Sequence, residues 1–331
     1  MLYTSTDHDG NPATVSGFVL VPDDAPPAQG RKVIAYTHGT VGVASNCAPS
    51  LVTNPEQQPL FLEGGDDLLG AGYVIAATDY QGLGTPGPHA YLVGDVEGMN
   101  ALDSVRAARN LTEAHASDEY AVWGHSQGGH ASLFTGQLAS TYAPELHLAG
   151  VAAGAPVPNL RDLFAVNIET TVGRVLIAMA LQSWAKVYGD ASLDQVVTPV
   201  ARPLVARIAK NCLYNPNQIL ASVPAALALG LTFLHTPPWG AQPWKTILDT
   251  NTPGAGRTDA PILIVQGGAD TIVAPDITER LADRLCAEGD TVDLRLLPGV
   301  GHLQTGRVAV PDVVRWIDDR FAGKPAPTTC R

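Results

Sequence analysis

Five consecutive residues, Gly124-His125-Ser126-Gln127-Gly128, have the types and spacing that could make a serine nucleophilic. They follow Tyr120–Trp123, an apolar run suited to a buried strand, and precede a helical stripe of apolar residues that starts at Gly129. A Gly-x-Ser-x-Gly motif between a strand and a helix is typical of a nucleophile elbow, a sharp turn that exposes the serine Oγ. The motif alone is more often an ordinary turn, but this context favours Ser126 as the nucleophile.

An acid and a base that could activate this serine come later in the chain. Asp270 lies in the loop that leaves a predicted buried strand, 261–266, and His302 lies in the loop after a second predicted strand, 292–297. Parallel strands place their ligands at the edge formed by their carboxyl ends. We therefore expect Ser126, Asp270 and His302 to converge as nucleophile, orienting acid and general base.

Two alternatives to these assignments follow from the same residues. Asp270 could only cap a turn, as Asp276 is expected to do at the start of the next helix. The position of Asp270 at the end of a strand favours the catalytic interpretation. The chain has nine histidines, and His302 is the one with the strand-loop context.

A tetrahedral intermediate at Ser126 would need backbone donors for its oxyanion. One donor is expected from the residue after the nucleophile, Gln127, and another from the loop after the third strand, 32–36. Thr40 is our candidate for that second donor, through its backbone N–H and its hydroxyl. His38 and Gly39 are the near alternatives, and Thr40 could also serve only to cap the turn.

The composition limits the classes to which this protein could belong. The chain has 331 residues, 45% of them apolar and 16% charged, which is enough to bury a large core. A net charge of −12 argues against nucleic acid and against anionic lipid surfaces as partners. No apolar run reaches the length of an integral membrane segment. No Cys-x-x-Cys spacing is present, so we expect neither a zinc site nor thioredoxin-type chemistry, and no metal is predicted.

The chain has four cysteines, which bear on its compartment. An even number of widely spaced cysteines suits two disulfides in an exported protein, with four free thiols in a cytosolic enzyme as the alternative. The chain begins directly in polar sequence, so a signal peptide is not present in it. We expect a secreted or periplasmic protein, and the oligomeric state is left open.

Strands alternate with helices over most of the chain, which predicts an α/β fold with a mainly parallel sheet flanked by helices. The rhythm stops for about a hundred residues, so we divide the chain into a core, 1–155 and 256–331, and an inserted helical cap, 156–255. The expected strands are 14–21, 32–36, 73–79, 120–123, 148–153, 261–266 and 292–297, and the expected core helices are 60–69, 96–111, the one from Gly129 and 308–321.

The cap contains three helix-like segments, 163–188, 193–210 and 218–234, which several prolines break into shorter pieces. An insertion at this point would lie over the edge of the sheet that carries Ser126. We expect it to supply the substrate pocket, although it could also be a packing subdomain without substrate contact. The candidate substrate-binding residues are Leu176, Ile177, Met179, Leu181, Trp184 and Leu231.

Several short motifs together resemble the secretory lipase family of α/β-hydrolases, the group typified by fungal lipase A. The most specific is Asn46-Cys47-Ala48-Pro49-Ser50, and the resemblance runs through nearly the whole chain. The other matching segments are Ala35-Tyr36, Asp79 to Gly82, Gly124 to Gly129, Gly267 to Asp270 and Gly301-His302.

The resemblance implies hydrolysis of carboxylic esters, including lipids, without a cofactor. It also implies a helical cap and two disulfides, Cys47–Cys212 and Cys286–Cys330. Relatives of the lipase-A type carry a longer C-terminal region that forms a flap, whereas only 29 residues follow His302 here. An esterase for soluble esters of short to medium chain length is therefore expected.

The leading hypothesis is a serine ester hydrolase that works through an acyl-enzyme on a small ester or lipid substrate. An acyltransferase or a peptidase could use the same three residues. A non-catalytic hydrolase-fold protein that binds apolar ligands under its cap is the alternative from another class.

Overall fold

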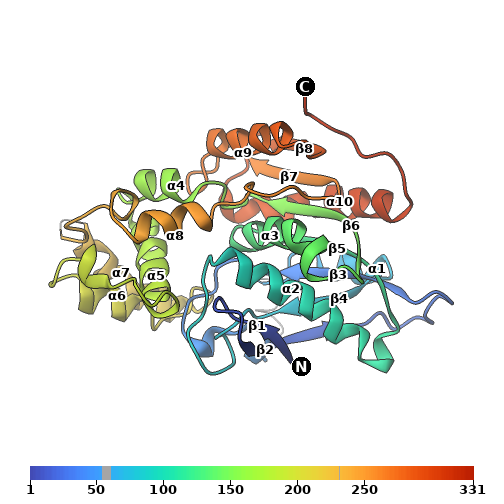
Figure 1. The fold of residues 1–331 in the computed structure, drawn as a ribbon, viewed down its shortest axis with the longest axis horizontal. Coiled ribbons are helices and arrows are strands. Elements are labelled where there is room, and N and C mark those ends of the chain that lie inside the picture. Colours follow the sequence, from blue (N-terminus) through green and yellow to red (C-terminus); the bar gives the residue numbers. More distant parts are fainter. Residues whose placement is uncertain (54–60, 231) are drawn as a thin grey trace.

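The computed structural model describes residues 1–53, 61–230 and 232–331, and its centre is an eight-stranded sheet (Figure 1). The strand order is β1-β2-β4-β3-β5-β6-β7-β8; β1 and β2 run antiparallel to their neighbours, and the strands from β4 to β8 are parallel. The strands are β1 (Leu2–Thr6), β2 (Pro12–Leu20), β3 (Arg31–Thr37), β4 (Val74–Thr78), β5 (Ala116–His125), β6 (His147–Gly154), β7 (Ile262–Gly267) and β8 (Val292–Leu297).

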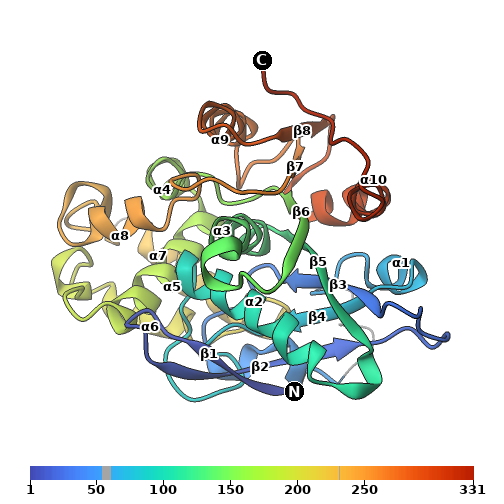
Figure 2. The same ribbon diagram turned by 45° about the vertical axis from the view of Figure 1, so that its right-hand side comes forward.

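Helices cover both faces of this sheet, which explains why the central strands are apolar along their whole length. Every residue of β4 and of β7 is buried. On one face α1 (Gly65–Gly70) and α10 (His302–Phe321) pack against the strands, and the other face carries α2 (Gly94–Arg109), α3 (Gln127–Tyr142) and α9 (Pro275–Ala287) (Figure 2).

The residues between β6 and β7 form a group of helices beside the sheet (Figure 1). They share a hydrophobic core with the segment before α2, which contributes Tyr91, Leu92 and Val93, and with Val96 in the first turn of α2. The insertion is therefore packed onto the core by apolar contacts. Its helices are α4 (Leu160–Asn167), α5 (Thr171–Val187), α6 (Arg202–Ile208), α7 (Pro216–Leu229) and α8 (Trp244–Thr250).

The α/β-hydrolase architecture with a mainly parallel sheet and an inserted helical group confirms the predicted fold class. Several boundaries differ from the prediction. Strand β1 and helix α8 were not anticipated, the expected helix 163–188 is two helices, and the expected helix 193–210 is a 3-10 turn, Leu193–Gln195, followed by α6. The other 3-10 turns are Ser45–Cys47, Pro49–Leu51, Thr112–Ala114 and Pro238–Gly240.

Two prolines lie inside helices, and only the one in the insertion was expected to interrupt its helix. Pro224 is in α7, and Pro311 is in α10. Helix α10 begins at His302, six residues before the predicted start at Val308. The expected helix 60–69 begins at a residue outside the described part of the chain, and its described part is α1. None of the helices in the described ranges is long and apolar enough to cross a bilayer.

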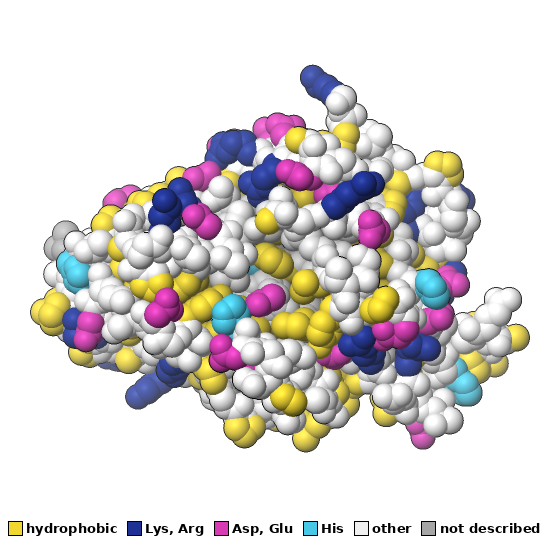
Figure 3. Space-filling view, in the orientation of Figure 1, with side chains coloured by type: hydrophobic (Ala, Val, Ile, Leu, Met, Phe, Trp, Pro, Cys, Tyr) yellow, Lys and Arg dark blue, Asp and Glu magenta, His cyan; other side chains and the backbone are white. Residues whose placement is uncertain are grey.

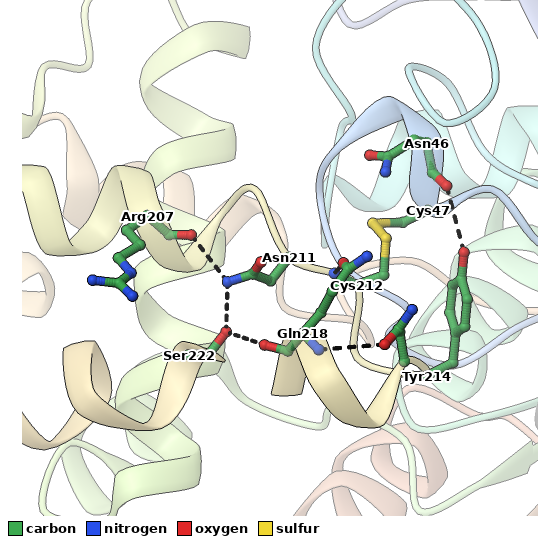
Figure 4. Close-up of a disulfide and its surroundings, with 9 residues drawn as sticks. Asn46, Cys47, Arg207, Asn211, Cys212, Tyr214, Gln218 and Ser222 are labelled. Atoms are coloured by element: carbon green, nitrogen blue, oxygen red, sulfur yellow. Dashed lines mark hydrogen bonds between the residues drawn. A yellow bond between two sulfur atoms is a disulfide. The ribbon is translucent and has the colours of Figure 1, made fainter. Parts of the chain in front are cut away.

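Two disulfides connect distant parts of the fold. Cys47 is bonded to Cys212, which joins the segment after β3 to the segment between α6 and α7 (Figure 4). Hydrogen bonds surround this link: Gln218 accepts from the Cys212 backbone N–H at 2.6 Å, and the Tyr214 hydroxyl donates to Asn46 O at 3.4 Å. The insertion is thus tied covalently to the core.

The second disulfide, Cys286–Cys330, links α9 to the C-terminal segment. That segment continues the edge of the sheet, since the Thr329 N–H donates to Val292 O at 2.7 Å. Both pairs are those that the family resemblance implies. Among the described residues no cysteine is free.

Replacing Cys286 and Cys330 together by serine should lower the free energy of unfolding. The bridge closes a loop of 44 residues. In the chain-entropy model, a constraint of this length on the unfolded chain stabilises the folded state by about 4 kcal/mol. Urea unfolding of the variant and the wild type at the same pH measures the difference. Equal midpoints would show that the bridge contributes nothing, and reactivity at Ser126 should be unchanged because neither cysteine lines the cavity beside it.

Candidate active site

The turn between β5 and α3 holds Ser126 in an unusual backbone conformation, with φ 59° and ψ −117°. The flanking glycines are needed because Thr37, at the end of β3, approaches so closely. A Cβ at Gly128 would lie 1.9 Å from Thr37 O, and one at Gly124 would lie 2.1 Å from Thr37 Oγ1. Strained backbone of this kind, between a strand and a helix, is the geometry of a nucleophile elbow.

The structure brings Ser126, Asp270 and His302 together. His302 Nε2 is 2.8 Å from Ser126 Oγ, and His302 Nδ1 is 2.7 Å from Asp270 Oδ2. Asp270 follows β7, as expected. His302 does not lie on a loop as we predicted, because α10 starts at this residue, with Gly301 as its N-cap.

Asp270 is held as a carboxylate by its surroundings. Burial raises its pKa, but the hydrogen bond and charge of His302 and the backbone N–H groups of Ile272 and Val273 outweigh burial, so the pKa of Asp270 is lowered. The two N–H groups donate to Oδ1 at 2.9 and 2.8 Å, and Gln266 Nε2 donates to Oδ2 at 3.1 Å. An ionised Asp270 accepts the Nδ1 proton of His302, which leaves Nε2 free to take the proton of Ser126.

Two backbone N–H groups beside Ser126 are available to a bound oxyanion. Neither the Gln127 nor the Thr40 N–H donates to a protein group in the described ranges. The loop that carries Thr40 lies against the elbow, since a Cβ at Gly39 would be 3.9 Å from the Ser126 Cβ. Tyr80 fixes this loop by donating from its hydroxyl to His38 O at 3.1 Å.

A buried carboxylate, Glu97, lies behind the elbow and was not anticipated from the sequence. Its Oε1 accepts from Gln127 Nε2 at 2.7 Å and from the Leu92 N–H at 2.9 Å. His130 Nδ1 is 2.8 Å from the other oxygen, and both side chains are 0% exposed. Glu97 therefore connects the elbow helix α3 to the segment before α2. Glu97 and His130 are 33 residues apart, and no local pattern indicates that they meet.

A small apolar cavity opens beside Ser126 and extends to the inserted helices. Its volume is about 30 Å³, and Thr40 and Tyr91 line it on the core side. Leu176 and Ile177, two of the predicted substrate-binding residues, line it from α5, together with Leu163 and Phe164 of α4. The insertion therefore supplies walls of the cavity that Ser126 faces.

The other predicted substrate-binding residues do not line this cavity. Met179, Leu181 and Trp184 are completely buried, because the middle of α5 is packed on all sides within the hydrophobic core of the insertion. Leu231 lies outside the described residues. We also expected 219–234 to form a second apolar wall, but none of its described residues lines this cavity, and α7 turns several apolar side chains to solvent.

Leu220 and Leu227 of α7 are 70% and 58% exposed. Figure 3 shows hydrophobic side chains at the surface over this end of the molecule. Periodicity alone did not distinguish a pocket wall from a solvent-facing helix.

In the described ranges no group of three or more His, Cys, Asp or Glu side chains could hold a metal ion.

A family model described as "Secretory lipase" matches residues 66–329. Lipase A of Arthroderma benhamiae is 26% identical over 352 residues, covering 100% of this chain and 72% of that protein. A Mycobacterium tuberculosis protein named "Probable inactive lipase MT1628" is 27% identical, covering 98% of this chain and 74% of its own length.

Solved structures share the fold. Candida antarctica lipase A in its closed state superposes with a TM-score of 0.81 at 20% identity, covering 99% of this chain and 78% of that one. The rice cell wall degrading esterase LipA of Xanthomonas oryzae, in a ligand-bound form, has a TM-score of 0.75 at 19% identity. The match covers 98% of this chain and 90% of that one. These likenesses extend over essentially the whole chain.

The geometry predicts that a fluorophosphonate probe will label Ser126 in the folded protein, because His302 can accept the Oγ proton. Asp270→Asn should slow labelling by several orders of magnitude, since the amide stabilises the wrong tautomer of His302. Peptide mass spectrometry after timed exposure measures the rate and the site. Ser140→Ala is the matched control, as Ser140 is an exposed serine on the same helix, α3. Labelling of Asp270→Asn at the wild-type rate would refute the assignment of Asp270.

Proposed function

This chain belongs to the secretory lipase family and is a carboxylic ester hydrolase, and we propose that it works through an acyl-enzyme on Ser126. The observation that carries the proposal is the pair of hydrogen bonds that His302 makes, 2.8 Å to Ser126 and 2.7 Å to Asp270. A nucleophile, a base and an orienting acid in this order are what acyl transfer requires.

In the proposed mechanism Ser126 Oγ attacks the ester carbonyl while its proton passes to His302 Nε2. The N–H groups of Gln127 and Thr40 stabilise the oxyanion of the tetrahedral intermediate. When the intermediate collapses, His302 gives its proton to the leaving alcohol. A water molecule then attacks the acyl-enzyme and its proton passes to His302; when this second intermediate collapses, His302 returns the proton to Ser126 Oγ and the carboxylic acid is released.

The acyl group is proposed to be short to medium in length and to occupy the cavity between Ser126 and α5. A water molecule needs about 10–15 Å³ of such volume, so a cavity of about 30 Å³ holds roughly two waters. An acetyl or propionyl group is of this size. Longer acyl chains would require displacement of half-buried wall residues such as Leu176.

An exported protein is proposed from the two disulfides and the family. Disulfides persist in oxidising compartments and are rare in the cytosol. We also propose 1–155 with 256–331 as the catalytic core and 156–255 as the cap. All five inserted helices fall within the proposed cap.

Ser126→Ala should abolish ester hydrolysis without unfolding the protein. Loss of the nucleophile in a comparable triad costs on the order of a millionfold in turnover. Hydrolysis of p-nitrophenyl acetate measures the loss, and a thermal unfolding curve confirms the fold. His302→Ala should fall by a similar order. Activity of Ser126→Ala near the wild-type level would exclude the acyl-enzyme proposal, and a wild type without activity on any ester would favour a non-catalytic binding protein.

Rates on p-nitrophenyl esters should be highest for acetyl to butyryl groups and fall for octanoyl. Leu176→Ala should move the optimum to longer chains, because the removed side chain opens the wall of the cavity. Each additional methylene that becomes buried is worth about 0.8 kcal/mol, or roughly fourfold in kcat/KM.

Leu181→Ala is the matched control for this experiment. It makes the same substitution in the same helix, but Leu181 is buried in the core of the insertion and does not touch the cavity. It should lower stability by about 2–5 kcal/mol and leave the chain-length profile unchanged. If both variants shift the profile equally, or if neither does, the acyl group does not bind in this cavity.

A further inference from the structure

The hydroxyl of Tyr91 lies beside the proposed oxyanion hole and has no part in the mechanism described above. Its oxygen is 2.9 Å from Thr40 Oγ1, and both residues line the cavity that Ser126 faces. Within the described ranges Thr40 is the only hydrogen-bonding partner of this hydroxyl. Tyr91 is 2% exposed, so its side chain is shielded from bulk solvent.

The backbone of Tyr91 is fixed by side chains of the insertion and of the core. Ser183 Oγ accepts from the Tyr91 N–H at 3.0 Å, and Trp184 Nε1 donates to Tyr91 O at 2.8 Å. The next residue, Leu92, has φ 53° and donates its N–H to Glu97. The position of the hydroxyl is therefore set jointly by α5 and by the carboxylate that also holds the Gln127 side chain.

Either hydroxyl could donate in this hydrogen bond, and we assign Tyr91 as the donor because the described residues offer its proton no other acceptor. Burial raises the pKa of Tyr91, so its hydroxyl keeps the proton. That proton has one acceptor in reach among the described residues, Thr40 Oγ1. With its oxygen accepting from Tyr91, the Thr40 hydroxyl can direct its own proton into the cavity.

We propose that Tyr91 positions the Thr40 hydroxyl as a third donor of the oxyanion hole, beside the backbone N–H groups of Thr40 and Gln127. The inference rests on the proposed function, because it concerns the oxyanion formed at Ser126. A donor that is oriented before the reaction stabilises the developing charge without reorganisation. Since Tyr91 is bonded to α5, the quality of the oxyanion hole depends on how the insertion sits on the core.

A double-mutant cycle on p-nitrophenyl acetate hydrolysis tests this inference. Thr40→Val removes the hydroxyl and should lower kcat by on the order of 100-fold with little change in KM, because the lost interaction exists only in the transition state. Tyr91→Phe should lower kcat about tenfold, since the donor remains but loses its orientation. The double variant should equal Thr40→Val alone. Thr40→Ser keeps the hydroxyl and should retain most of the activity.

Binding of a transition-state analogue gives a second readout that a loss of packing would not change. The affinity for phenylboronic acid, which forms a tetrahedral adduct with the serine, should fall in each variant by the same factor as kcat/KM. Tyr142→Phe is the matched control: it removes a partly buried tyrosine hydroxyl, bonded to Asp103, at the far end of α3. It should leave kcat and analogue affinity unchanged.

Independent effects of Thr40→Val and Tyr91→Phe that multiply in the double variant would overturn the inference. A Tyr91→Phe variant with wild-type kcat, or one that changes only KM or thermal stability, would overturn it as well. Either result would leave the acyl-enzyme proposal intact as long as Ser126→Ala is inactive. Full activity of Ser126→Ala would instead reject the proposed function itself.

Discussion

The close approach of Thr37 to the elbow glycines is the constraint on which the site depends. The Thr37 hydroxyl donates to Gly128 O at 2.9 Å, and no Cβ fits at either glycine of the motif beside it. The end of β3 and the start of α3 are therefore held in direct backbone contact. This contact accompanies the strained conformation of Ser126 and brings the loop that leads to Thr40 against it, so that Thr40 and Ser126 line the same cavity.

The inserted helices are part of the same construction. They share a hydrophobic core with the segment before α2 and are tied to the core by Cys47–Cys212. Tyr91 lies where these contacts meet, bonded to α5 through its backbone and to Thr40 through its hydroxyl. The position of the insertion consequently determines the walls of the cavity beside Ser126 and the surroundings of Thr40.

Most of the sheet could be predicted from the sequence, since buried parallel strands are short apolar runs that local pattern indicates directly. Prediction of the insertion was poorer. Apolar periodicity identified helices but not their ends, and it placed Leu181 and Trp184 in the substrate wall, although they pack inside the insertion. An apolar stripe has the same appearance whether a pocket, a helix or solvent lies opposite. His302 lies between Ser126 and Asp270, as predicted from its place after a strand, but its position at the start of α10 was not foreseen.

The sequence by itself determined the elements whose signals are local. The elbow motif, the strand that precedes Asp270, the strand that precedes His302, and each segment that resembles the secretory lipases are all seen in residues close together in sequence. Only the tertiary structure decided which distant groups meet: Thr40 with Tyr91, 51 residues apart, and Glu97 with Gln127, 30 residues apart. The physical reason is that the type of a side chain determines which hydrogen bonds it can donate or accept. Its partner is set by how helices and strands pack, and no local pattern contains that packing.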